Sequence, residues 1–174
     1  GYIFQFCPLV GAMVQEDGKD GRTAIISDGL NDYETSWQLQ EMDPNGRTFK
    51  WQFQPLPGYA DPDQPDMASN PAPDEDGDGK PDSWPRDWYN EALGEYVWPG
   101  FLSQNVTNAD QEVYWAMDDR DNKEFEYYPF INDSTRKGLG VQIDGRAFQW
   151  SNALAENTIF FVYTITNVSD KDLD

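Results

Sequence analysis

The stretch TIFFVYTITN, residues 158–167, decides the fold class of this chain. Its side chains alternate between two faces, with Ile159, Phe161, Tyr163 and Ile165 on one face and the residues at even positions on the other. Every residue before Asn167 is β-branched or aromatic, the types that fit a pleated surface best. The pattern therefore predicts a β-strand.

Short segments of the same kind recur along the rest of the chain, and Gly, Pro, Asn and Asp separate them. The turn sequences at 43–46, DPNG, and 144–145, DG, each predict a hairpin. Residues 88–93 are the best candidate for a short helical turn, ended by Gly94. The other predicted strands are 2–6, 9–14, 23–27, 35–41, 47–54, 112–117, 125–128, 139–143 and 146–150. The fold class that follows is all-β, an antiparallel β-sandwich of immunoglobulin-like or jelly-roll type.

The length of 174 residues suits one β-rich domain, 1–174, or a fragment of a larger chain. Within it, residues 55–85 form a long insertion rich in proline and aspartate. Proline cannot continue a helix or a central strand, so we expect a loop there and not a core element. The abrupt ends of the chain predict a processed chain or a piece of something longer.

The charge balance limits the partners of the chain. There are 32 acidic and 12 basic residues, which gives a formal net charge of −20 at pH 7. Such a surface repels nucleic-acid phosphates and anionic membranes and attracts cations. We therefore expect no nucleic-acid partner, and the absence of a long apolar run predicts no membrane span.

The residue types that are missing limit the chemistry. The chain has no histidine, and Cys7 is its single cysteine, which excludes His-based nucleophile pairs and zinc sites as well as intrachain disulfides. Catalysis by carboxylates alone, as in glycoside hydrolysis, remains open.

The clearest chemistry lies in DEDGDGKPD, residues 74–82, which carries carboxylates at relative positions one, three, five and nine and glycines at four and six. Calcium takes six to eight oxygen ligands, and glycine lets the backbone turn around the ion. The predicted ligands are the side chains of Asp74, Asp76 and Asp78, the backbone carbonyl of Lys80 with its ammonium pointing outward, and the carboxylate of Asp82, directly or through water. A solvated acidic turn without an ion is the alternative.

This loop resembles the thrombospondin type 3 repeat, whose loops read Asp-x-Asp-Gly-Asp-Gly-x-x-Asp, and more loosely the dockerin calcium loop. All four acidic positions and both glycines match. It departs from an EF-hand because Pro85 stands where a bidentate Glu is required. The resemblance covers residues 74–82 alone and implies an extracellular, structural calcium site.

A second resemblance involves FFVYTITNVSDKDL, residues 160–173, which is similar to the strand and turn of immunoglobulin-like repeats in bacterial surface proteins. Together with the aspartate loop and PDSWP, residues 81–85, it makes the chain resemble part of a large secreted bacterial surface protein. The resemblance implies a secreted or cell-surface location, and no functional residue is carried over from it.

Residues 118–124, DDRDNKE, form another acidic cluster. A second cation could be held there by Asp119, Asp121 and Glu124. The alternative is a charged hairpin end in which Arg120 and Lys123 pair with the acids. Asp61, Asp63 and Asp66 form a third patch, for which we expect a solvated loop.

Three functions follow from these features. The first is a non-enzymatic, calcium-stabilised structural module of a surface layer, filament or adhesin, with self-association or other surface proteins as partners, by strand exchange between unpaired edges. The second is lectin-like binding of glycans through the rings of Trp84, Trp88, Tyr89, Trp98 and Phe101. The third is a glycoside hydrolase that uses a pair of carboxylates.

Overall fold

The computed structural model describes residues 7–29, 51–61 and 63–174. The predicted strands 2–6 and 35–41 and the turn at 43–46 lie outside these ranges, and of the predicted strand 47–54 only the end is described. Within the described ranges the chain is all-β, with antiparallel strand pairs and one 3-10 turn. No described helix has the length and hydropathy to cross a membrane.

The chain divides into two compact units. Unit 1 comprises Gly1–Gln54, Asp118–Gln142 and Ile165–Asp174, and unit 2 comprises Pro55–Met117 and Ile143–Thr164. Each unit is therefore assembled from segments that are far apart in the sequence.

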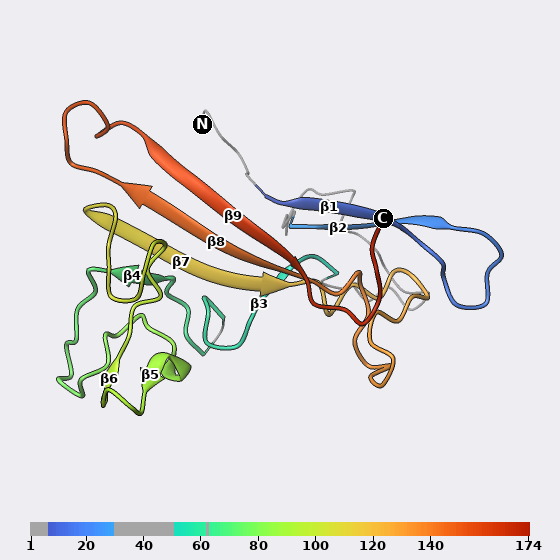
Figure 1. Cartoon of the computed structure of the whole chain (residues 1–174), viewed down its shortest axis with the longest axis horizontal. Helices are drawn as coiled ribbons and strands as arrows, with labels where there is room; N and C mark the ends of the chain where they lie inside the picture. The colour runs from blue at the N-terminus through green and yellow to red at the C-terminus, as the bar shows by residue number, and fades with distance from the viewer. Residues whose placement is uncertain (1–6, 30–50, 62) are drawn as a thin grey trace. The chain divides into compact units, whose positions relative to one another are not determined.

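The longest strands are β7 (Gln111–Asp118), β8 (Val141–Gln149) and β9 (Ile159–Asn167). They lie side by side in a sheet of order β3-β7-β8-β9 (Figure 1), in which β3 is Gln54–Pro55 and β4 (Ala68–Asn70) also pairs with β7. The predicted strands at 112–117 and 158–167 are thus confirmed as β7 and β9.

The hairpin predicted at Asp144-Gly145 is wrong, because β8 runs through both residues without a turn. Gly145 serves a different purpose there. The indole of Trp115 on β7 lies so close over Gly145 that a Cβ at that position would overlap the ring. The glycine permits close packing on the sheet, which is the other common use of glycine in a strand.

The first described strands, β1 (Leu9–Val14) and β2 (Thr23–Asp28), form an antiparallel hairpin in unit 1. Their register runs from Leu9 opposite Asp28 to Val14 opposite Thr23, which confirms the two strands predicted at 9–14 and 23–27. Ile25 and Ser27 project to one face of β2, and both are fully buried.

Later segments of unit 1 hold this hairpin. The backbone N–H of Met13 donates to the carbonyl of Asp174 (3.1 Å), and the side-chain amide of Asn122 donates to the carbonyl of Ile26 (3.1 Å). The backbone N–H of Asp17 donates to the carbonyl of Glu126 (2.8 Å).

Residues 125–128, predicted as a strand, form none. The N–H of Glu126 donates to a side chain, the carboxylate of Glu16 (3.3 Å), and its carbonyl accepts from a loop residue, Asp17. These bonds replace the ladder that a neighbouring strand would provide, so the segment packs as irregular backbone.

Unit 2 is built around a group of rings that we call the aromatic cluster: Tyr59, Trp84, Trp88, Trp98 and Tyr114. Neighbouring ring centroids lie 5.4–5.9 Å apart, and all six of these ring pairs are edge-on or tilted, which avoids the unfavourable face-to-face arrangement of aromatic quadrupoles. Ala68 is buried against the cluster.

The cluster corrects the expectation that residues 55–85 contribute only loop. Trp84 and Ala68 from this segment are buried core residues, and Ala68 belongs to β4. Proline restricts the regular structure to the short pieces β3 and β4, but it does not prevent single side chains from entering the core.

The helical turn predicted at 88–93 is also wrong. The 3-10 turn η1 (Arg86–Trp88) is followed by a small hairpin of β5 (Tyr89–Asn90) and β6 (Glu95–Tyr96). The Asn90 carboxamide oxygen accepts from the N–H groups of Ala92 (3.0 Å) and Leu93 (3.1 Å). This side chain closes a tight turn and so competes with a helix.

Candidate metal centre

The loop at 74–82 is a closed turn in unit 2, between β4 and η1. The N–H of Asp82 donates to the carbonyl of Pro73 (2.8 Å), which joins the two ends of the loop. Gly77 and Gly79 have φ of 72° and 88°, a conformation that other residues rarely adopt. The glycines therefore allow the backbone to curl around the space between the aspartates.

Three carboxylates converge in this turn. One oxygen from each of Asp74, Asp76 and Asp78 lies within 4.8 Å of the other two, and within the described ranges no other group of three acidic, histidine or cysteine side chains converges in this way. All three residues are exposed. Carboxylate oxygens are hard ligands, which suit a hard cation better than a soft metal.

Backbone N–H groups fix the three carboxylates. Asp74 accepts from Gly77 (2.9 Å) and Gly79 (3.1 Å), one with each oxygen. Asp76 accepts from the N–H of Asp78 (3.1 Å), and Asp78 from that of Lys80 (2.8 Å). Each bonded oxygen keeps a second lone pair, so these bonds orient the carboxylates and leave them able to bind a cation.

The side chains of the two other residues predicted to bind the ion, Asp82 and Lys80, make contacts elsewhere in the loop. The Asp82 carboxylate accepts from the N–H of Glu75 (3.1 Å), and it does not belong to the converging triad. The Lys80 ammonium does not point outward as predicted. It donates to three carbonyls, of Pro81 (3.1 Å), Asp82 (3.0 Å) and Trp84 (3.2 Å).

The end of the loop is fastened to the core of unit 2. Trp84 donates its indole N–H to the carbonyl of Ser69 on β4 (2.7 Å), and the Ser83 hydroxyl accepts from the N–H of Ser69 (3.2 Å). A cation bound to the triad would therefore also help to keep Trp84 in place in the aromatic cluster.

The second predicted cation site has a different arrangement. Asp119 is fully buried, and its carboxylate accepts from the Ser27 hydroxyl (2.7 Å) and from the N–H groups of Leu139 (2.6 Å), Gly140 (3.1 Å) and Val141 (3.0 Å). Asp121 and Glu124 do not converge on it.

Burial raises the pKa of Asp119, and the four donors act in the opposite direction. The sequence carries one signal for this arrangement, Gly138-Leu139-Gly140, in which both glycines have a φ of 75°. Alternating conformations of this kind turn successive N–H groups toward one anion. We did not expect Asp119 to be a structural anchor in unit 1.

The third acidic patch is more than solvated loop. The Asp61 carboxylate accepts from the N–H groups of Gly58 (2.9 Å), Asp63 (3.0 Å) and Gln64 (2.7 Å), and these bonds hold its pKa below the ordinary value. Asp63 and Asp66 are exposed.

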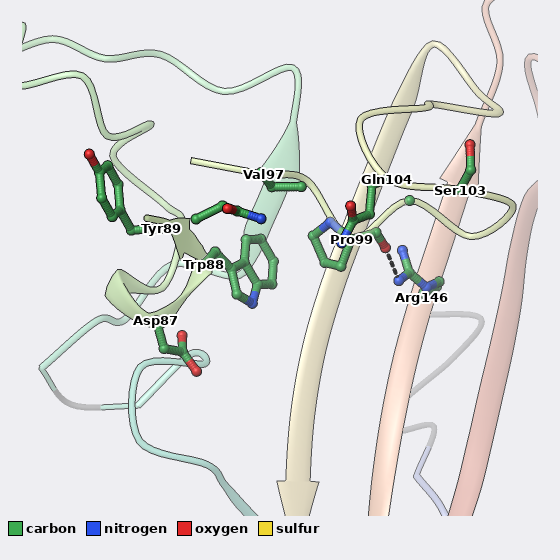
Figure 2. Close-up of a pocket in the computed structure, with 10 residues that line it drawn as sticks. Asp87, Trp88, Tyr89, Val97, Pro99, Ser103, Gln104 and Arg146 are labelled. Atoms are coloured by element: carbon green, nitrogen blue, oxygen red, sulfur yellow. Dashed lines mark hydrogen bonds between the residues drawn. The ribbon is translucent and has the colours of Figure 1, made fainter. Parts of the chain in front are cut away.

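The rings considered for glycan binding divide into two groups. Trp84 and Trp98 are buried, and Trp98 donates its indole N–H to the buried Glu112 (3.0 Å). Tyr89 and Phe101 are about half exposed, and Trp88 is intermediate. The buried pair is core and Trp88 packs within the aromatic cluster, so Tyr89 and Phe101 are the exposed rings among these five. Figure 2 shows that the ring of Tyr89 points away from that of Trp88.

Comparison with known proteins adds no relative to this description: the chain matches no family model, no curated protein and no solved structure.

Proposed function

We propose that this chain is a calcium-stabilised module of a secreted or cell-surface protein, with a structural role. The observation that carries the proposal is the convergence of Asp74, Asp76 and Asp78 on a loop whose backbone already holds their carboxylates. Three like charges so close together repel one another, and a divalent cation between them removes that cost. The net charge of −20 favours cation binding further.

Bound calcium would raise the stability of the folded chain. A ligand that binds only the folded state stabilises it, by about 2.7 kcal/mol when the free ligand is at about 100 times its Kd. That is a large share of the free energy of unfolding of an ordinary domain. Because Trp84 follows the loop directly, the stabilisation would reach the aromatic cluster.

The test is a calorimetric calcium titration of the wild-type chain and of the double variant Asp76→Asn, Asp78→Asn. Each of these aspartates accepts its backbone bond with a single oxygen, so asparagine can keep the turn and remove the charge. The matched control is Asp63→Asn, Asp66→Asn, which removes the same charge from exposed positions in another loop.

We expect calcium to bind the wild type and the control and not the loop variant, and chelation to lower the Tm of the first two only. No calcium binding by the wild type, or binding that survives in the loop variant, would refute the site.

An assembly role draws support from β9. This strand ends the strand order of its sheet, carries no charged residue, and exposes Ile159, Phe160 and Ile165 by half or more. An apolar edge is a template for a strand of another chain, and an uncharged edge is where two acidic copies repel least. We propose that a second copy pairs there and that the sheets belong to a sandwich of immunoglobulin-like or jelly-roll type.

A further inference from the structure

Six aspartates of the chain are followed directly by glycine: Asp17, Asp20, Asp28, Asp76, Asp78 and Asp144. This pair of residues is chemically labile, because glycine has no side chain to keep its backbone nitrogen away from the preceding carboxyl group. The nitrogen can form a bond to Cγ of the aspartate, which closes a five-membered succinimide ring. A glycine nitrogen that is held in another contact cannot do so, and the six pairs differ in this respect.

The regular structure holds two of the six glycines. The N–H of Gly29, which follows β2, donates to the carbonyl of Pro8 (2.9 Å). Gly145 lies inside β8, between β7 and β9 in the strand order, so the sheet fixes its backbone. The pairs at Asp28 and Asp144 are therefore protected, because the nitrogen must leave these contacts before it can attack the carboxyl group.

The aspartate loop at 74–82 protects its own two pairs. Gly77 and Gly79 follow Asp76 and Asp78, and both donate their N–H groups to the Asp74 carboxylate, at 2.9 Å and 3.1 Å. One side chain thus holds both of the nitrogens that could react in this loop.

The loop between β1 and β2 contains the last two pairs, and the first of them lies in a closed turn. The N–H of Asp17 donates to the carbonyl of Glu126 (2.8 Å), and the N–H of Lys19 donates to the carbonyl of Glu16 (3.4 Å). These two bonds restrain the backbone on both sides of Gly18.

The pair at Asp20 and Gly21 has no such restraint. Both residues are exposed, and among the described residues no hydrogen bond involves either of them. A Cβ added to Gly21 would meet no atom within 4 Å, so the space around this peptide bond is open. Of the six pairs, this one is the least restrained by the described part of the chain.

We propose that Asp20 is a site of spontaneous modification, at which aspartate is converted to isoaspartate. The Gly21 nitrogen bonds to Cγ of the protonated Asp20 carboxyl group, and the hydroxyl of that group leaves with the proton of the nitrogen as water. A water molecule then opens the succinimide at one of its two carbonyls, which restores aspartate or yields isoaspartate. One water molecule is released and one is consumed, so the isomerisation needs no co-reactant.

The product has the same mass and the same charge as the original chain, but its main chain is one methylene longer at position 20. The change lies two residues before Arg22, whose guanidinium donates to the carbonyl of Met13 and pairs with the carboxylate of Asp174 (2.7 Å). The modification therefore alters the backbone next to a contact that joins β1 to the segment after β9.

The experiment incubates the chain under native conditions and in urea, at a mildly acidic pH where part of the aspartates is protonated. A chelator is present throughout, so that the protection of Asp76 and Asp78 comes from Asp74 alone and the result does not depend on calcium. Proteolytic peptides are then fragmented by electron transfer, which distinguishes isoaspartate from aspartate of equal mass. The native rate of each pair is divided by the rate of the same pair in urea.

We expect Asp20 to have the highest ratio of the six, close to one. The ratios at Asp28, Asp76, Asp78 and Asp144 should be lower by at least about threefold, the effect of one hydrogen bond of ordinary net strength. Asp17 should lie below Asp20. If any of the other five pairs has a ratio equal to or above that of Asp20, the proposal is overturned.

Two variants test the cause. Asp20→Glu keeps the charge at an exposed position, but its side chain would have to close a six-membered ring, so the modification at position 20 should disappear without a change in Tm. Asp74→Ala releases the nitrogens of Gly77 and Gly79, and the ratios at Asp76 and Asp78 should rise toward that of Asp20. Unchanged ratios in Asp74→Ala would contradict the argument that the contacts of the glycine nitrogen set the pattern.

Discussion

Replacement of Gly145 by alanine tests how closely the indole of Trp115 packs on β8. A Cβ at position 145 would meet three atoms of the Trp115 indole, including Nε1 at 2.6 Å, whereas real Cβ atoms essentially never approach a heavy atom within 3.0 Å. The ring or the strand must move, and overpacking of this kind costs about 1–3 kcal/mol. Alanine also restricts the unfolded chain, which returns about 0.4–1 kcal/mol. The net expectation is a loss of about 1–2 kcal/mol in the free energy of unfolding.

Gly11 on β1 provides the control. A Cβ there would meet the carbonyl oxygen of Ile25 at 3.6 Å and Cγ1 of Ile26 at 3.7 Å, which are ordinary contacts. Gly11→Ala should therefore leave stability unchanged or raise it by about 0.4–1 kcal/mol. Urea denaturation, followed by circular dichroism, measures both variants against the wild type.

A double-mutant cycle identifies the cause. In a Trp115→Ala background the indole is absent, so Gly145→Ala should cost nothing further, and the two substitutions should couple strongly. The packing argument is refuted if Gly145→Ala destabilises the chain equally in both backgrounds, or if it matches Gly11→Ala.

Two other predictions concern charge and assembly. The Ser151 hydroxyl (2.6 Å) and N–H (2.7 Å) lower the pKa of Asp110, so the stability that Asp110 adds is present above the unfolded-state pKa of about 3.9 and is lost as the pH falls through the lower folded-state value. Ser151→Ala should destabilise the chain at neutral pH and converge with the wild type in acid; a difference independent of pH would contradict this. Ile159→Lys on β9 should convert a self-associated chain to monomer in sedimentation velocity, whereas Leu154→Lys, at a 95% exposed position that precedes the strand, should not. A wild-type chain that is monomeric at all concentrations would refute pairing through β9.

Periodicity and composition predicted much of the fold. The strands at 9–14, 23–27, 112–117 and 158–167 are confirmed, because alternation and residue types that favour a pleated strand are local properties of each segment. Gly145 could not be predicted in the same way. An Asp-Gly pair favours a turn, but a glycine can also accommodate a large neighbour, and the neighbour here is Trp115, 30 positions earlier in the sequence.

In the candidate site, too, local features could be predicted from the sequence and long-range contacts could not. The spacing of Asp74, Asp76 and Asp78 predicted their convergence because the contacts within a short loop are local. The role of Asp119 was missed because its donors come from Ser27 and from residues 139–141, and a local pattern does not record such pairings.

The bonds that hold the β1–β2 hairpin determine when it becomes secure during synthesis. Its partners are Asn122, Glu126 and Asp174, which leave the ribosome after the hairpin itself. At about 5–20 residues per second, the interval between residues 29 and 174 is about 7–30 s. A two-stranded hairpin alone is marginal in water, so the hairpin is only partly held until all three partners have been made. For this chain, the rate of translation is therefore expected to influence the yield of folded protein.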